Sequence, residues 1–323
     1  MVASSSEDGT RSASADRVPS GSELSDSSPV GPAQADPAPS GLAPSGPVSA
    51  GPPSADTDQP LLRLQDVGRS FGPVQALTGI NLDIPAGQVT ALAGDNGAGK
   101  TTLVKCIAGI WQPTSGQLLW RGKPVSLHSP RDATQLGIAA VYQDLALCDN
   151  LDIVQNMLLG HEAVRFGLLD EVSMELTAKK TLQDLRVTTV RSIRQPVGSL
   201  SGGQRQAVAV AKAVMQDVQL VIMDEPTAAL GVSQTELVLS LITRLASRGH
   251  AVLLISHNLN DVFQVADRIA VLYLGRLAAV GPTAEFDTQS VVELMTTGAS
   301  TPRRDGSGSE PAASRHVTSG SED

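Results

Sequence analysis

The sequence predicts a parallel α/β fold, because short apolar runs alternate along the chain with helical patterns of hydrophobic residues. Hydrophobic residues recur at helical spacing over the ranges 101–110, 151–159, 172–185, 204–215, 234–248 and 260–266. The apolar runs suit strands buried on both faces of a sheet, and they span residues 89–93, 137–142, 220–223, 251–255 and 268–273. Strands that alternate with helices are typical of a three-layer core around a parallel sheet.

Two regions depart from this alternation. The segments 62–67 and 80–84 alternate apolar with polar residues, as half-solvated antiparallel strands do. The helical patterns from about 151 to 215 have no strong strand between them. We therefore expect one ordered domain, residues 61–298, with an antiparallel β subdomain and an α-helical subdomain at about 144–215.

The composition of the two ends differs from that of the middle. Residues 1–58 hold 14 Ser, 9 Pro, 6 Gly and 9 Ala, no aromatic residue, and 8 acidic against 2 basic side chains. Residues 299–323 are similarly rich in Ser, Gly, Thr and charge. Such segments cannot bury enough apolar surface to offset the entropy of ordering, so we predict disordered tails at 1–58 and 299–323. A regulatory or docking role for the tails remains the alternative.

Charge and cysteine content exclude several classes of protein. Residues 59–298 hold 21 acidic and 19 basic side chains, so the domain has no electrostatic footprint for nucleic acid. No run of 18 apolar residues is present, and the N-terminus has neither a basic flank nor an apolar segment. We therefore expect neither a membrane-spanning helix nor a secretory signal. Cys106 and Cys148 form no C-x-x-C pair, so we expect two reduced thiols rather than a disulfide or a metal site.

A phosphate-binding motif follows the apolar run 89–93. Residues 94–101 match G-x-x-x-x-G-K-[ST] and lead into a helical pattern. The glycines let successive backbone N–H groups point at phosphate oxygens, and the following helix adds its positive end. In this reading Lys100 reaches the β- and γ-phosphates and the Thr101 hydroxyl binds Mg²⁺. The nucleotide-binding residues are then Gly94, Asp95, Asn96, Gly97, Ala98, Gly99, Lys100, Thr101 and Thr102.

Two adjacent acids, Asp224 and Glu225, follow the apolar run 220–223. Neighbouring side chains at a strand end point in different directions, so the two acids can serve different purposes. We expect Asp224 to hold the Mg²⁺ shell and Glu225 to take a proton from an attacking water. Considered alone, the pair is also compatible with a solvated strand end.

The string LSGGQ at residues 200–204 resembles the signature motif of ATP-binding cassette (ABC) ATPases. Ser201, Gly202, Gly203 and Gln204 stand at the start of a helical pattern, where exposed N–H groups make a second anion site. The resemblance covers about 61–298. It implies a P-loop NTPase with a RecA-like parallel sheet, an antiparallel β subdomain and an α-helical subdomain, and an ATPase that uses ATP and Mg²⁺.

The same resemblance implies roles for three further residues. Gln143 is similar to the Q-loop glutamine that touches Mg²⁺ and water, and His257 to the switch histidine that contacts the γ-phosphate. Phe71 stands where the family has an aromatic residue that stacks on adenine. The chain departs from the family at two positions. Gly231 replaces an aspartate that usually makes a contact across the subunit boundary, and Lys212 stands where arginine is commoner.

Residues 94–97, 142–146, 149–151 and 226–232 resemble the ATPase subunits of bacterial monosaccharide importers. One P-loop and one signature motif indicate the single-cassette branch. The resemblance implies membrane permease subunits as partners and, indirectly, a periplasmic or extracellular sugar-binding protein. It also implies a peripheral position on the cytoplasmic face of the membrane, with no nucleic acid bound.

About 100 residues separate the P-loop from the signature motif. This separation, beyond a helical insertion, places the signature motif poorly for completing its own nucleotide site. The resemblance to ABC ATPases implies that it completes the site of a facing copy, so we expect a head-to-tail homodimer. Two alternatives are a soluble ABC-type ATPase acting on ribosomes or DNA, and a regulatory module that binds ATP without hydrolysing it. Intact Asp224, Glu225 and His257 argue against the second.

Overall fold

A six-stranded sheet forms the centre of the fold in the computed structural model, which describes residues 59–215 and 217–299. Except for Ala299, the two predicted tails lie outside these residues. The strand order is β12-β11-β3-β10-β9-β6, with β12 antiparallel to β11 and the other neighbours parallel. The strands span Arg276–Pro282 (β12), Arg268–Tyr273 (β11), Val89–Gly94 (β3), Ala251–Ile255 (β10), Leu220–Asp224 (β9) and Ile138–Val141 (β6).

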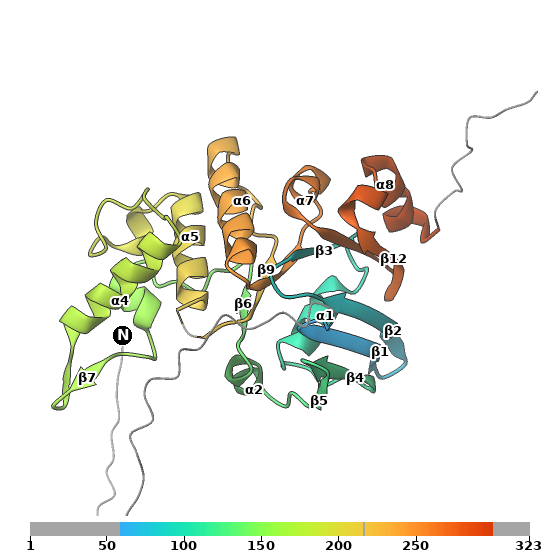
Figure 1. Cartoon of the computed structure of the whole chain (residues 1–323), viewed down its shortest axis with the longest axis horizontal. Helices are drawn as coiled ribbons and strands as arrows, with labels where there is room; N and C mark the ends of the chain where they lie inside the picture. The colour runs from blue at the N-terminus through green and yellow to red at the C-terminus, as the bar shows by residue number, and fades with distance from the viewer. Residues whose placement is uncertain (1–58, 216, 300–323) are drawn as a thin grey trace, which may run out of the picture. The chain divides into compact units, whose positions relative to one another are not determined.

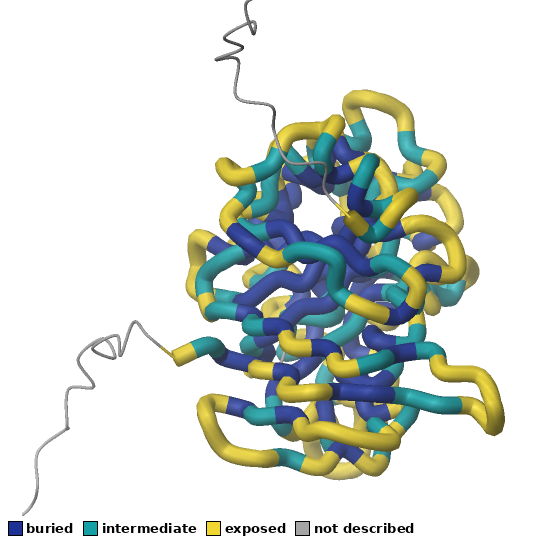
Figure 2. Tube along the Cα trace, turned by 90° about the vertical axis from the view of Figure 1, so that its right-hand side faces the viewer, coloured by how far each residue is buried: buried dark blue, intermediate teal, exposed yellow. Residues whose placement is uncertain are grey.

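Helices cover one face of this sheet. Figure 1 shows α6 (Val232–Ser247), α7 (Leu259–Val265) and α8 (Thr288–Thr297) on the same side of it. Every residue of β3 and β10 is buried, which explains why their sequences are apolar except for Thr90. Figure 2 shows the buried residues gathered in the interior of the described part and the exposed ones along its loops.

The opposite face carries α1 (Lys100–Ile107) and an antiparallel sheet of order β2-β1-β4-β5. Its strands span Val74–Ile84 (β2), Leu62–Phe71 (β1), Ser115–Trp120 (β4) and Lys123–Val125 (β5). Leu62 pairs with Ile84 and Leu64 with Leu82, and all four side chains are buried. Apolar residues of α1, including Leu103 and Ile107, belong to the same hydrophobic cluster as these strands. The predicted antiparallel β subdomain is therefore present, with α1 packed beneath it.

Three helices stand between β6 and β9 in the chain: α3 (Ile153–Leu158), α4 (Glu171–Asp184) and α5 (Gly202–Ala213). They pack on one another around buried Met157, Met174 and Val208. Each begins at a capping side chain, Asp152, Asp170 or Ser201, which accepts a backbone N–H of the first turn.

Several short elements were not predicted from sequence. They are β4, β5, β12, α8, the small hairpin β7 (Val164–Arg165) and β8 (Leu168–Leu169), and α2 (Pro130–Gln135). Helix α2 has a single buried residue, Ala133, so it lacks apolar periodicity, and its local signals are the capping box at Ser129 and Asp132 and the proline at its first position. The predicted helix 101–110 ends at Ile107 instead, because the chain turns at Ala108 and Gly109 takes a positive φ.

No helix within residues 59–215 and 217–299 is both long enough and apolar enough to cross a membrane.

The two thiols differ in burial. Burial raises the pKa of Cys106 to about 11, against a smaller opposing effect of Arg69, whereas Cys148 is partly exposed. We expect native protein to react with one equivalent of a thiol reagent at neutral pH and unfolded protein with two, because the thiolate is the reacting form. A Cys148→Ser variant should show no fast-reacting thiol. Two fast thiols in the native protein would contradict the burial of Cys106.

Candidate nucleotide site

The parallel strands deliver the predicted site residues to one edge of the sheet. The phosphate motif begins at the end of β3, Asp224 ends β9, and Gln143 and His257 each come two residues after β6 and β10. Parallel neighbours end at the same edge, so these four segments gather although they are far apart in the chain. The phosphate motif, Gln143 and Asp224 border a cavity of about 530 Å³, whose walls do not include His257. Its walls are Val74, Gln75, Ala76, Asp95, Asn96, Gly97, Gly99, Lys100, Thr101, Thr102, Gln143, Asp224, Glu225, Leu274 and Gly275.

The phosphate motif forms a tight loop against the start of α1. Gly97 and Gly99 take φ of 82° and 107°, values that side-chain-bearing residues rarely adopt. Helix α1 begins at Lys100 with Gly99 as its N-cap, so its first N–H groups are not capped by a side chain. Lys100 Nζ donates to the carbonyl oxygens of Gly94 at 2.7 Å and Asp95 at 3.0 Å. The loop therefore offers backbone donors and a fixed cation to a polyphosphate.

Asp224 is electrostatically unfavourable in this position. Burial, followed by the neighbouring Glu225 carboxylate, raises its pKa, while Lys100 and Lys105 act in the opposite direction. The described residues contain no group of three or more His, Cys, Asp or Glu that could hold a metal ion. A cation bound here would therefore draw on the hydroxyl of Thr101, the amide of Gln143 and ligand oxygens besides Asp224, a donor set that suits Mg²⁺.

Glu225 is held in an unusual backbone conformation. Its φ is 51°, in the left-handed region, which costs a residue of this type about 1–3 kcal/mol. Its N–H donates to the Ile255 carbonyl oxygen at 2.9 Å, and its Oε1 lies 2.8 Å from His257 Nδ1. The Glu225 side chain is 16% exposed and that of His257 is 66% exposed. A mostly buried carboxylate is thus oriented by a histidine on the rim.

A second polar contact fixes the segment after Glu225. Thr227 Oγ1 donates to Oδ2 of the buried Asp261 on α7, at 2.6 Å. Gly231 then forms the N-cap of α6, where a Cβ would meet open space. A larger side chain, including the aspartate that the family usually has, would therefore fit at Gly231.

The four signature residues do not border the cavity. Ser201 caps α5 through a capping box with Gln204, and the bond from Ser201 N–H to Gln204 Oε1 measures 2.9 Å. A Cβ on Gly202 would lie 2.8 Å from Leu230 Cδ2, and one on Gly203 would lie 2.9 Å from Gln234 Cβ. The two glycines therefore allow α5 to approach the start of α6, where the Gly203 N–H donates to Gln234 Oε1 at 3.3 Å.

Phe71 also lies outside the cavity walls, at the end of β1. Its exposed ring meets Trp111 edge to face with centroids 4.8 Å apart. Val74, Gln75 and Ala76 border the cavity instead, and the predicted adenine contact of Phe71 stays a prediction.

Sequence reasoning missed the wall formed by β2 and by the β11–β12 turn. Gly275 N–H donates to the Ala98 carbonyl oxygen at 2.8 Å, and the Gly275 carbonyl oxygen accepts from Thr78 N–H at 2.8 Å. This turn therefore joins the phosphate loop to β2. Gly275 after an apolar strand signals a turn, but no local pattern reveals which loop it meets.

Comparison with known proteins agrees with this geometry. The sequence profile of the ABC transporter family matches residues 77–228. The xylose/arabinose import ATP-binding protein of Sulfolobus acidocaldarius is 44% identical over 236 residues, which cover 73% of this chain and 94% of that protein. The fructose import ATP-binding protein of Rhizobium meliloti is 42% identical, covering 76% of this chain and 97% of that protein. A ribose import ATP-binding protein of Rubrobacter xylanophilus is 40% identical, and the match covers 48% of its length.

Solved structures agree at the level of the fold. A nucleotide-free ATP-binding cassette from an ABC transporter superposes with a TM-score of 0.63 at 26% identity, covering 72% of this chain and 98% of that one. A component of an ABC transporter complex from Clostridium perfringens superposes with a TM-score of 0.62 at 28% identity, covering 71% of this chain and 90% of that one. The motifs, the fold and these relatives together show that the chain belongs to the ABC transporter family and is an ATP-binding, ATP-hydrolysing subunit.

Proposed function

We propose that this protein hydrolyses ATP to drive the import of a monosaccharide through a membrane permease. The relatives named above act in the import of xylose or arabinose, fructose and ribose, which supports a sugar as cargo. The observation that carries the ATPase mechanism is the cavity that the P-loop, Asp224 and Glu225 share. The relatives give no support to the alternative of a soluble ATPase acting on ribosomes or DNA.

The chemistry assigned to the cavity is in-line attack of water on the γ-phosphate. Glu225, which is oriented by its contact with His257, takes the proton of the water. Lys100 and the N–H groups of residues 95–102 stabilise the charge on the phosphate. Thr101, Gln143 and Asp224 would hold Mg²⁺, which would neutralise the phosphate oxygens. The raised pKa of Asp224 supports this assignment, because a neighbouring cation would relieve the cost of its ionised form.

A second copy of the chain would complete the site. Ser201 and Gly202 are exposed at the start of α5 and lie outside the cavity walls, so they are available to a nucleotide held by a facing protomer. ATP between Lys100 of one protomer and Ser201 of the other would hold the dimer together, and hydrolysis would remove the contact to the γ-phosphate. The two conformations would then differ in affinity for the partner protomer.

The permease would receive this change near Gln143. An apolar cavity of about 390 Å³ lies beside Gln143, between α2, β6, α3 and α5, and its walls include Tyr142, Leu145, Met157 and Met215. A permease segment bound there would be displaced by movement of the Gln143 loop or of the helices within 144–215. We assign residues 61–298 to the nucleotide-binding domain and place it on the cytoplasmic face of the membrane.

Replacing Glu225 with glutamine should slow hydrolysis by roughly 10²–10⁴-fold, because the amide cannot accept the proton of the water. Equilibrium binding of ATP should remain, since Lys100 and the phosphate loop are intact. Single-turnover hydrolysis and nucleotide binding on the same preparation measure both. Near-normal turnover would remove Glu225 from the role of base.

Replacing Lys100 with alanine should weaken nucleotide binding itself, because it removes a fixed cation from a partly enclosed phosphate site. Titration with a fluorescent ATP analogue measures the affinity, and the melting temperature of the nucleotide-free protein controls for loss of the two bonds from Nζ to the loop carbonyls. Unchanged affinity with unchanged stability would contradict the assignment.

Sugar uptake tests the transport function directly. In a strain that lacks this chain, uptake of the cargo monosaccharide should fail, return with the wild-type chain and stay absent with Glu225→Gln. The wild-type chain should also co-purify with a permease that has several membrane spans. Restoration of uptake by the hydrolysis-deficient variant would contradict the proposal, as would co-purification with ribosomes or DNA in place of a permease.

A further inference from the structure

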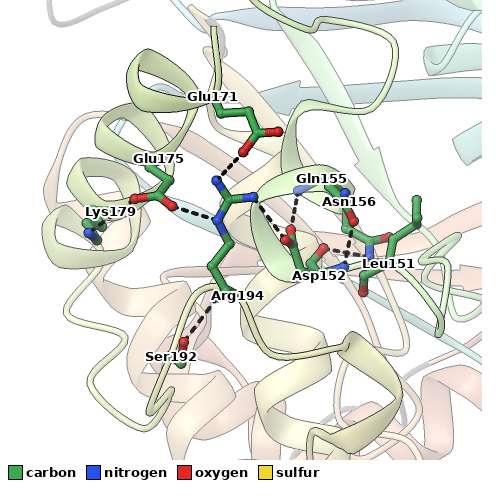
Figure 3. A network of polar contacts seen from close by, with 9 residues as sticks. All are labelled: Leu151, Asp152, Gln155, Asn156, Glu171, Glu175, Lys179, Ser192 and Arg194. Carbon is green, nitrogen blue, oxygen red and sulfur yellow. Dashed lines mark hydrogen bonds and ion pairs between the residues drawn. The ribbon is translucent and has the colours of Figure 1, made fainter. Parts of the chain in front are cut away.

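The chain between α4 and α5 leads directly into the signature loop, and Arg194 lies midway along it. Figure 3 shows its guanidinium reaching three carboxylates. Nε lies 2.6 Å from Glu175 Oε1, Nη2 lies 2.9 Å from Glu171 Oε2, and Nη1 lies 3.3 Å from Asp152 Oδ2. Every nitrogen of the guanidinium is therefore engaged, which fixes the orientation of the side chain.

The three carboxylates come from two different elements. Glu171 and Glu175 are one turn apart at the start of α4, whereas Asp152 is the N-cap of α3. Asp152 uses its other oxygen, Oδ1, to accept from Gln155 N–H at 2.7 Å. Arg194 thus joins the segment before the signature loop to the N-terminal ends of two helices at once.

Backbone bonds run alongside this contact. Val197 N–H donates to the Leu151 carbonyl oxygen at 3.0 Å, and Gly198 N–H donates to the Asp149 carbonyl oxygen at 2.9 Å. The Asp149 side chain accepts from Arg205, in the first turn of α5, at 3.0 Å. Residues 193–198 therefore lie against residues 149–154 over their whole length.

The segment that receives these bonds is itself fixed by a fully buried side chain. Asn156, with 0% exposure, accepts from Cys148 N–H at 2.7 Å. It donates to the carbonyl oxygens of Cys148, Leu151 and Asp152 at 2.9–3.1 Å. The loop 148–152 continues the chain from Gln143, so the signature segment is attached to the chain that follows Gln143.

We propose that Arg194 is a positioning residue for hydrolysis, which holds the Ser201 loop in a defined place relative to the loop that follows Gln143. The inference rests on the proposed function, in which Ser201, Gly202 and Gly203 complete the nucleotide site of the facing protomer. Displacement of this loop by an ångström lowers turnover, because catalysis depends on the geometry of the shared site. The nucleotide affinity of the P-loop half is independent of it.

If Arg194 only stabilised the fold, its replacement would lower folding stability and leave the kcat of the folded protein unchanged. Arg194 is 37% exposed, and exposed ion pairs contribute little to folding stability. The chain offers a matched control in Arg63, which forms two bonds to Asp83, at 2.7 and 2.9 Å, in the antiparallel sheet. The side chains of that pair are 46% and 40% exposed, so its loss should also cost the fold little.

The test compares Arg194→Gln with Arg63→Gln in the full chain. For Arg194→Gln we expect kcat to fall about three- to tenfold and the ATP-dependent dimer to weaken by a similar factor. The KM for ATP and the affinity for a fluorescent ATP analogue at low protein concentration should change less than about twofold, because the P-loop half is untouched. Arg63→Gln should retain the wild-type kcat. Equal kcat in wild type and Arg194→Gln, or an equal loss in both variants, overturns the proposal.

Asp152→Asn tests the same contact without altering Arg194. Asparagine keeps an oxygen that can cap α3 but lacks the charge that Arg194 binds. The kcat of Asp152→Asn should fall below the wild-type value, as that of Arg194→Gln does. The kcat of Arg194→Lys should lie between those of Arg194→Gln and the wild type, because one ammonium cannot span three carboxylates. Should Arg194→Gln fail to fold, Asp152→Asn decides the question, and wild-type kcat in that variant overturns the proposal.

Wild-type protein separates this inference from the proposed function. Turnover per chain should rise with protein concentration if two protomers share each site. A wild-type turnover independent of concentration, in protein that sedimentation shows to be monomeric, rejects the shared site itself. Concentration-dependent turnover in the wild type together with an unaffected Arg194→Gln rejects the role of Arg194 alone.

Discussion

The site depends on the parallel pairing of β3, β10 and β9. In this ladder Ile255 pairs with Leu92 on one side and with Asp224 on the other, so the ends of three strands are held in one register. The bond from Glu225 N–H to the Ile255 carbonyl oxygen extends that register by one residue. A shift of β9 by one residue would exchange the faces on which Asp224 and Glu225 lie. Because all three strands are buried among apolar side chains, such a shift is costly.

That buried support lets the site hold groups in unfavourable states. Asp224 is destabilised as an anion by burial and by Glu225, and Glu225 has a left-handed backbone conformation. Both lie at the end of β9, whose other four residues are buried. A rigid core thus keeps two carboxylates in positions that the isolated chain would avoid. Their negative charge, which the protein does not neutralise, would be available to a bound cation.

The signature loop is held by contacts of another kind. The central sheet is joined by apolar burial, whereas the segment before Ser201 is joined to its surroundings largely by arginine–carboxylate pairs and backbone bonds near the surface. Contacts of this kind orient the segment but add little to folding stability, since water can replace them. In the proposed dimer, such attachment would suit a loop that meets a second protomer and then releases it. Gly202 and Gly203 meanwhile keep α5 close to α6.

Features that depend on residues close together in the chain could be predicted from the amino-acid sequence. The glycine spacing of the phosphate loop, the apolar runs of the buried strands and the capping pattern at Ser201 each encode a backbone conformation within about ten residues, and each is present in the structure. Tertiary structure alone decided that Val74 and Gly275 border the cavity, that Glu225 meets His257, and that Phe71 packs on Trp111. It also decided that α2 and β12 form, because α2 packs on β6 and β12 pairs with β11. Local patterns record what a segment prefers, whereas its neighbours in space follow from how the whole core packs.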